Sequence, residues 1–256
     1  MTRFVDKNRY LYYLLNKMIS VNSSRDIRPI PLALLLPALL ALSACAKDAT
    51  PEERGKAVYA SYDCKKCHRI GKVGGSLGPD LTFVGFRKDA AFLDLWLKDP
   101  GAWKEGVVMP KFFFKDHVRK DLAAYLATLQ GKEHLEGVRP WDEGDLRSDP
   151  VKRGAALYAK VGCVSCHGKN GAGGYPNNNV VGGKIPALTK VAEGFSKEEL
   201  LDKLRQGVPQ SAKADPAGAD PLLNMPAWGE KLKDDELGAL ADYLISLQPK
   251  TSGGEW

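Results

Sequence analysis

Two five-residue strings in the chain combine residue types that bind metals and cofactors. Residues 64–68 read Cys-Lys-Lys-Cys-His and residues 163–167 read Cys-Val-Ser-Cys-His, so both follow the pattern Cys-x-x-Cys-His. Paired cysteines at this spacing serve zinc sites, redox dithiols, disulfides and covalent haem attachment. The two strings hold four of the five cysteines in the 256-residue chain.

The histidine that follows each pair separates these chemistries. A zinc ribbon places its two cysteine pairs about 15–20 residues apart, whereas 96 residues separate Cys67 from Cys163. A redox dithiol does not need a histidine directly after its second cysteine. Covalent haem needs all three residues, because two thiols add to the porphyrin vinyl groups and the adjacent imidazole binds the iron. The pattern therefore predicts two c-type haems, with thioether cysteines and axial histidines at Cys64, Cys67, His68, Cys163, Cys166 and His167.

The similarity between the two strings extends into an internal repeat. Residues 54–68 align with 153–167 without a gap, and 122–130 (LAAYLATLQ) align with 240–248 (LADYLISLQ). Glycine and tyrosine recur at matching positions, Gly55 with Gly154 and Tyr59 with Tyr158. Such extended self-similarity indicates a duplicated structural element.

The repeat predicts the domain organisation. The closing segments have apolar spacing compatible with helices, and Ser196, with Glu199 three residues later, predicts a helix N-cap. Residues 132–148 are polar and rich in Gly and Pro, which is typical of a linker. We therefore expect an all-α fold with a first repeat at 52–131 and a second repeat at 149–249.

Each repeat has one methionine after its haem-binding string. Met109 and Met225 are both followed by proline, and both precede the closing helix. A lone methionine is ordinarily a core residue, but the correspondence between the repeats favours a second axial ligand to each iron. His117 and His134 are alternatives in the first repeat; they have no counterpart in the second, and we expect them to be solvated surface histidines.

This order of features resembles the class I cytochromes c. In that family a helix with a glycine and an aromatic residue leads to the Cys-x-x-Cys-His string, and a proline loop, a Met-Pro loop and an amphipathic helix follow. The resemblance implies that Pro79 and Pro186 accept a hydrogen bond from the proximal histidine. The first repeat resembles the cytochrome domains of terminal oxidases and nitric oxide reductases. The second resembles free electron carriers and the haem subunit of cbb-type oxidases, with a Gly/Asn-rich insertion at 168–184 that composition predicts to be a flexible loop.

Apolar residues near these motifs are candidates for the walls of the haem sites, although each such residue is more often ordinary core. They are Leu81, Phe83, Trp96, Phe112 and Leu126 in the first repeat and Leu188, Leu200, Leu204 and Trp228 in the second. The segment KFFFKD (111–116) offers either a docking patch or, as we prefer, aromatic packing over the porphyrin.

The N-terminal segment, residues 1–44, resembles an export signal. An apolar run at 30–45 follows Arg25 and Arg28, and LSAC (42–45) resembles a bacterial lipobox in which Cys45 receives lipid. An uncleaved anchor helix is the alternative, although the run is short and contains two prolines. We prefer Met18 as the true start of the protein, because it gives a signal of ordinary length. Ala46, in place of aspartate, mildly favours the outer membrane.

Net charge gives no sign of a nucleic-acid partner. The chain carries a formal charge of +6, of which +4 lies in residues 1–45, and the remainder holds no basic stripe. With both irons coordinated by His and Met, we expect a membrane-tethered dihaem carrier that relays electrons in a periplasmic respiratory chain. The donor would be a quinol-oxidising complex or a dehydrogenase, and the acceptor an oxidase or reductase. The alternatives are a dihaem enzyme, of the peroxidase or thiosulfate-oxidising type, and the haem subunit of a terminal oxidase complex.

Overall fold

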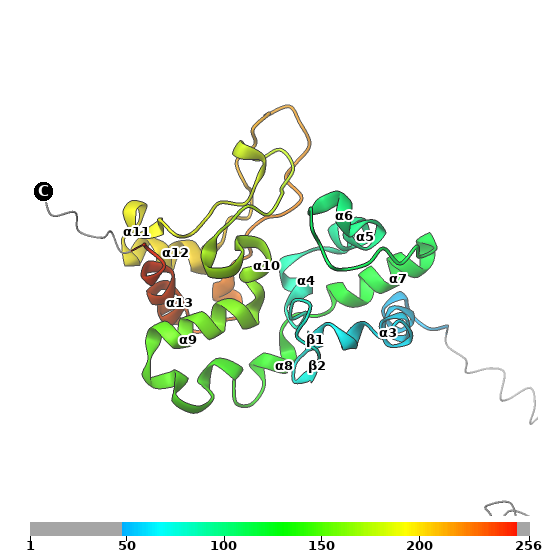
Figure 1. Cartoon of the computed structure of the whole chain (residues 1–256), viewed down its shortest axis with the longest axis horizontal. Coiled ribbons are helices and arrows are strands. Elements are labelled where there is room, and N and C mark those ends of the chain that lie inside the picture. The colour runs from blue at the N-terminus through cyan, green and yellow to red at the C-terminus, as the bar shows by residue number, and fades with distance from the viewer. Residues whose placement is uncertain (1–47, 250–256) are drawn as a thin grey trace, which may run out of the picture. The chain divides into compact units, whose positions relative to one another are not determined.

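The computed structural model describes residues 48–249, and the expected all-α fold is confirmed (Figure 1). These residues, from Ala49 onward, belong to one compact unit. The predicted signal segment, the alternative start at Met18, the lipobox with Cys45 and the following Ala46 lie outside the described residues. Within residues 48–249 no helix has the length and apolar character needed to span a membrane.

The first repeat contains five α-helices and a two-stranded antiparallel hairpin in which Arg69 pairs with Gly74. Its elements are α3 (Pro51–Ser61), the 3₁₀ turn η1 (Cys64–Lys66), β1 (Arg69–Ile70), β2 (Val73–Gly74), α4 (Val84–Arg87), α5 (Ala90–Lys98), α6 (Pro100–Trp103) and α7 (Asp116–Ala127).

The linker and the second repeat are helical as well. The linker contains α8 (Lys132–Leu135), η2 (Pro140–Asp142) and η3 (Gly144–Ser148). The second repeat contains α9 (Pro150–Leu157), a π-helical turn η4 (Tyr158–Gly162), α10 (Val164–His167), η5 (Lys169–Gly171), η6 (Val181–Gly183), α11 (Val191–Gly194), α12 (Lys197–Gln206), η7 (Trp228–Glu230) and α13 (Asp234–Ser246).

Capping boxes define where two of these helices begin. Thr50 precedes α3; its hydroxyl accepts from the Glu53 backbone N–H at 3.3 Å, and the Glu53 carboxylate accepts from the Thr50 N–H at 2.8 Å. Ser196 and Glu199 form the same reciprocal pair at the start of α12, which confirms Ser196 as its N-cap. Such pairs satisfy N–H groups that the first helical turn leaves unbonded.

The matched glycines mark the place where the first and last helices of each repeat cross. α3 packs on α7 and α9 packs on α13 (Figure 1). A methyl group on Gly55 would lie 1.9 Å from the Asp121 carbonyl oxygen on α7, and one on Gly154 would lie 2.0 Å from the Ala239 carbonyl oxygen on α13. Only glycine lets the backbones approach this closely, so the same crossing is built twice.

The matched tyrosines pack next to these crossings. Tyr59 lies against Tyr125 with ring centroids 5.7 Å apart, and Tyr158 lies against Tyr243 at 5.4 Å. The partner tyrosines also occupy equivalent positions in the two closing segments. The repeat seen in the sequence is therefore a repeat of tertiary contacts.

The linker is folded onto the second repeat. Trp141 is fully buried, and its indole N–H donates to the Glu236 carboxylate on α13 at 2.6 Å. The Arg139 guanidinium donates to the same carboxylate, which also accepts from the Lys233 backbone N–H at 2.8 Å. The buried Glu236 charge is thus fully bonded and closes the N-terminal end of α13.

His134 is not the solvated histidine that we expected. Its side chain is 1% exposed, and Nε2 lies 3.1 Å from the Asp80 carboxylate. Burial acts to raise the pKa of Asp80, but the hydrogen bonds from His134 and Thr82 outweigh it and hold that pKa low. The aromatic rings of Phe83 and Trp141 cover the imidazole, because the linker folds back over the first repeat.

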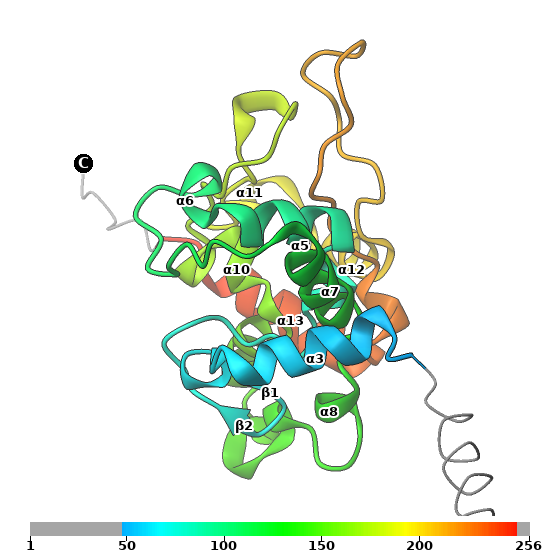
Figure 2. The ribbon, with the colours of Figure 1, turned by 90° about the vertical axis from the view of Figure 1, so that its right-hand side faces the viewer.

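The Gly/Asn-rich segment 168–184 is largely loop, as its composition predicts, and its asparagines bond it to a second loop. Asn177, Asn178 and Asn179 bond through their side chains to backbone groups of residues 215–223, at distances from 2.7 to 3.2 Å. Figure 2 shows the two loops projecting from the helices. The asparagines act as backbone mimics that hold two long loops together.

Candidate functional site

The haem-binding string of the second repeat follows directly from α9. The helix widens into the π-helical turn η4, which ends at Gly162 with φ +91°. The next turn begins at once: the Cys166 and His167 backbone N–H groups donate to the Cys163 carbonyl at 3.1 and 2.9 Å. This single turn brings Cys163, Cys166 and His167 to one side of the backbone.

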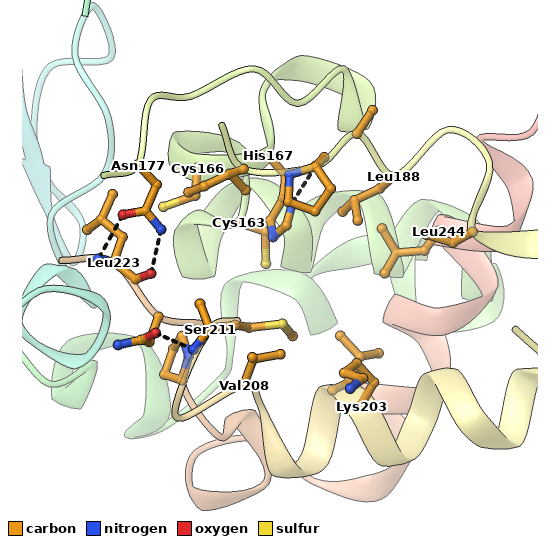
Figure 3. Close-up of a pocket in the computed structure, with 18 of the residues that line it drawn as sticks. Cys163, Cys166, His167, Asn177, Leu188, Lys203, Val208, Ser211, Leu223 and Leu244 are labelled. Carbon is orange, nitrogen blue, oxygen red and sulfur yellow. Dashed lines mark hydrogen bonds between the residues drawn. The ribbon is translucent and has the colours of Figure 1, made fainter. Parts of the chain in front are cut away.

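These three residues line a cavity of about 500 Å³. Figure 3 shows Cys163 and His167 on one wall and Val208 and Lys203 on the opposite wall. The lining is mainly apolar. It includes all four wall residues expected in this repeat, Leu188, Leu200, Leu204 and Trp228, and two further aliphatic residues, Leu240 and Leu244.

His167 is held by the backbone of the proline loop. Its Nδ1 donates to the Pro186 carbonyl at 3.1 Å, and within the described residues Nε2 has no hydrogen-bond partner (Figure 3). Burial lowers the pKa of His167, which favours the neutral imidazole. A neutral ring with one nitrogen bonded to a carbonyl and the other free is the arrangement of a metal-ligating histidine.

Met225 lines the same cavity. Its loop is fixed by a β-bridge to Val208, whose N–H donates to the Met225 carbonyl at 2.8 Å. Gly207 makes this approach possible: it adopts φ +67°, and a Cβ there would lie 2.5 Å from the Met225 carbonyl oxygen. The cavity therefore holds two thiols, an imidazole and a thioether.

The first repeat positions its histidine in the same way. His68 Nδ1 donates to the Pro79 carbonyl at 2.9 Å, and Nε2 has no partner within the described residues. Gly78 passes so close to the ring that an added Cβ would lie 2.5 Å from the imidazole Cε1. Cys64 is half-buried and Cys67 is exposed.

Met109 is held by Trp96, which the sequence indicated only as a candidate wall residue of the haem site. The Trp96 indole N–H donates to the Met109 sulfur at 3.3 Å. Met109 and Cys64 pack on one apolar cluster, which also includes Leu81 and Leu126. The hydrogen bond had no signal in the sequence, because indole and thioether lie on separate elements without a fixed spacing.

The remaining predicted wall residues of the first repeat lie elsewhere. Phe83 is fully buried, but it packs in the core of the second repeat, 5.9 Å from the Trp228 ring. Phe112 and Phe114 pack on Tyr62, whereas Phe113 is 82% exposed. Phe83 is therefore a contact between the repeats rather than a haem wall of the first.

The donor set fits haem better than a bare metal ion. All four cysteines of the strings are unpaired thiols, and no group of three or more His, Cys, Asp or Glu side chains within residues 48–249 could hold a metal ion. His117 is exposed on α7, and the His134 imidazole is bonded to the Asp80 carboxylate. Thiols beside a carbonyl-bonded imidazole, with a thioether on an apolar wall, match covalent haem.

Comparison with known families assigns both repeats to cytochrome families. Residues 52–130 match the family Cytochrome c, and residues 149–244 match the family Cytochrome C oxidase, cbb3-type, subunit III. Cytochrome c oxidase subunit 2 of Alkalihalophilus pseudofirmus is 30% identical over 34% of this chain and 27% of its own length. A nitric oxide reductase subunit of Halomonas halodenitrificans is 25% identical over 46% of this chain and 72% of its own length.

One solved chain, from the Kuenenia stuttgartiensis reducing HAO-like protein complex, covers 77% of this chain and 96% of its own length. Its sequence identity to this chain is 18%, and the TM-score is 0.27. The family matches fall on the two segments that contain the duplicated haem-binding string. The chain is therefore a class I c-type cytochrome with tandem domains, a protein that binds haem c covalently and transfers electrons.

Proposed function

We propose that the chain carries one haem in each repeat and relays electrons between redox proteins on the periplasmic side of a bacterial membrane. The observation that carries this proposal is the duplicated histidine: both Nδ1 atoms donate to a proline carbonyl, at 2.9 and 3.1 Å, and both Nε2 atoms remain free among the described residues. Haem bound there supplies a one-electron couple whose potential rises when methionine is the second axial ligand.

The side chains around each site have distinct tasks in this proposal. The proline carbonyls of Pro79 and Pro186 fix the orientation of the histidines and make them more basic ligands. Met109 and Met225 would supply the second ligand to each iron, which would leave no position for a substrate. The apolar walls exclude water, which keeps the surroundings of the two oxidation states alike.

The relatives support the choice of partners. The names of the two protein relatives place them in a cytochrome c oxidase and a nitric oxide reductase, both of which are redox enzymes by name. We propose a quinol-oxidising complex or a dehydrogenase as the donor and a terminal oxidase or reductase as the acceptor.

A haem count with an optical redox titration of the holoprotein tests the two-site proposal. We expect two haems per chain and two one-electron transitions. Met109→His and Met225→His should each lower the potential of one transition and leave the other in place, so each variant is the control for the other. A variant that moves neither transition contradicts that ligand. Ready binding of carbon monoxide to the reduced protein contradicts saturation and favours the enzyme alternative.

The membrane anchor is a separate proposal. It is supported by the apolar run before Cys45 and by the small residues that precede the cysteine. Cys45→Ala should release the protein from the membrane fraction, and Ala46→Asp should move it from the outer to the inner membrane. Retention of the Cys45→Ala protein in membranes would instead support an uncleaved anchor helix.

A further inference from the structure

Arg87 ends α4 in the first repeat, yet its guanidinium lies on the haem-binding string of the second repeat. Nη1 donates to the Gly162 carbonyl at 3.2 Å and to the Ser165 hydroxyl. Gly162 directly precedes Cys163, and Ser165 directly precedes Cys166. The first repeat thus supplies a cation to the turn that carries both thioether cysteines of the other repeat.

The backbone is shaped to receive this side chain. Gly162 adopts φ +91°, and a Cβ there would lie 2.5 Å from the Arg87 Cζ, so only glycine admits the guanidinium. Arg87 is 8% exposed and lines the same cavity as Cys163, Cys166 and His167. Its Nε is buried and has no hydrogen-bond partner among the described residues.

The Arg87 charge is not neutralised by a carboxylate. Among residues 48–249 no acidic side chain forms an ion pair with Arg87. Asp80 accepts a hydrogen bond from Arg87 through its backbone carbonyl, at 3.3 Å, and its carboxylate, which stabilises the Arg87 charge without forming an ion pair, is engaged by His134 and Thr82. Lys88 adds a second cation, held over the rings of Phe92, Trp96 and Tyr175.

An unpaired buried cation acts strongly on a neighbouring redox centre. Exposed charges are screened by salt, whereas buried ones are screened much less. Arginine keeps its charge inside proteins, so its field does not disappear on burial. A fixed positive charge favours the oxidation state that has gained an electron, which is the ferrous state.

We propose that Arg87 supplies a fixed positive charge to the second haem site. Through this residue the first repeat raises the reduction potential of the haem in the second repeat. This inference rests on the proposed function, because it requires a haem at Cys163 and Cys166. The step concerned is the gain of one electron by the ferric iron from a reductant, with no ligand bond made or broken. Docking of the first repeat thereby favours electron transfer toward the second.

Redox titration of the holoprotein with Arg87→Gln tests the proposal. The transition assigned to the second haem, which is the one that Met225→His moves, should shift down and the other should stay. With an effective dielectric constant near 20, the ratio of reduced to oxidised second haem at a fixed potential should fall about tenfold. For one electron this corresponds to a fall in its reduction potential of about 59 mV. Arg147→Gln removes an exposed arginine from η3 and should shift neither transition.

Two further variants separate charge from structure. Arg87→Lys keeps a cation at this place, so the reduction potential of the second haem should stay close to its wild-type value. Ser165→Asp keeps Arg87 but sets a carboxylate beside it, and should lower the same transition even if Arg87→Gln fails to load haem. An equal shift in the lysine and glutamine variants, or no shift in Ser165→Asp, overturns the inference. A count of one haem per wild-type chain overturns the two-haem proposal instead.

Discussion

The hydrogen bond from Trp96 to Met109 predicts that Trp96→Phe lowers the reduction potential of the first haem. The indole N–H lies 3.3 Å from the methionine sulfur, and the ring stacks on Tyr175 at 6.2 Å between centroids. Phenylalanine keeps most of this aromatic packing and removes only the N–H. The bond withdraws electron density from the sulfur, which then stabilises the ferric iron less; without it, the ferric state gains stability.

The size of the shift follows from the strength of the bond. A hydrogen bond contributes about 0.5–1.5 kcal/mol net, and a thioether sulfur is a weak acceptor. The difference between the two oxidation states is therefore at most about 1 kcal/mol. Since a tenfold change corresponds to about 59 mV for one electron, the potential should fall by roughly 20–40 mV.

The assay is a spectroelectrochemical titration of the holoprotein, with the first transition identified by Met109→His. Trp103→Phe is the matched control, because Trp103 packs on Phe92 in the same repeat and its indole makes no hydrogen bond to a methionine. An unchanged or raised first potential in Trp96→Phe would refute the reasoning. An equal fall in Trp103→Phe would attribute the effect to aromatic packing alone.

The remaining predictions concern stability. Gly154→Ala places a methyl group 2.0 Å from a carbonyl oxygen of α13 and should lower the free energy of unfolding in urea by more than about 2 kcal/mol, whereas Gly238→Ala, with open space around it, should raise it by up to about 1 kcal/mol. Burial lowers the pKa of Lys88 from 10.5 to about 8. The unfolded chain therefore binds more protons between those pH values, and the free energy of unfolding should rise by up to about 3 kcal/mol across them, a rise that Lys88→Met abolishes. Asn177→Ala removes two hydrogen bonds to the Leu223 backbone, at 2.8 and 3.2 Å, and should speed amide exchange and proteolysis in both long loops; unchanged rates would contradict their mutual support.

The sequence alone predicted those features that depend on residues at a fixed spacing along the chain. The two haem-binding strings, the Ser196 cap and the matched Gly55 and Gly154 each depend on neighbours along the chain or on a helix crossing repeated in both halves. The duplication supplied an internal comparison that a single copy would not offer. The all-α fold follows from these local patterns.

Contacts between the repeats were beyond this kind of reasoning. Phe83, Arg87 and His134 each belong by position to the first repeat or linker, yet each finds partners in another part of the chain. No periodicity marks such residues, since each contact joins elements that are distant in the sequence and occurs in only one of the two repeats. Composition predicted a loop at 168–184 but not its bonding, because solvated asparagines and asparagines that bond to a second loop look alike in sequence.

The buried carboxylate of Glu236 determines where the chain can be divided. The family match of the second repeat begins at residue 149, but Arg139 and Trp141, which bond this carboxylate, lie before it. A fragment that begins at residue 149 would lose both of these hydrogen bonds and the Trp141 ring that is buried in the core of the second repeat, a loss of about 3–5 kcal/mol. The smallest self-sufficient piece that contains the second haem-binding string therefore starts upstream of Arg139, so the boundary of sequence similarity and the boundary of the folded piece are different places in the chain.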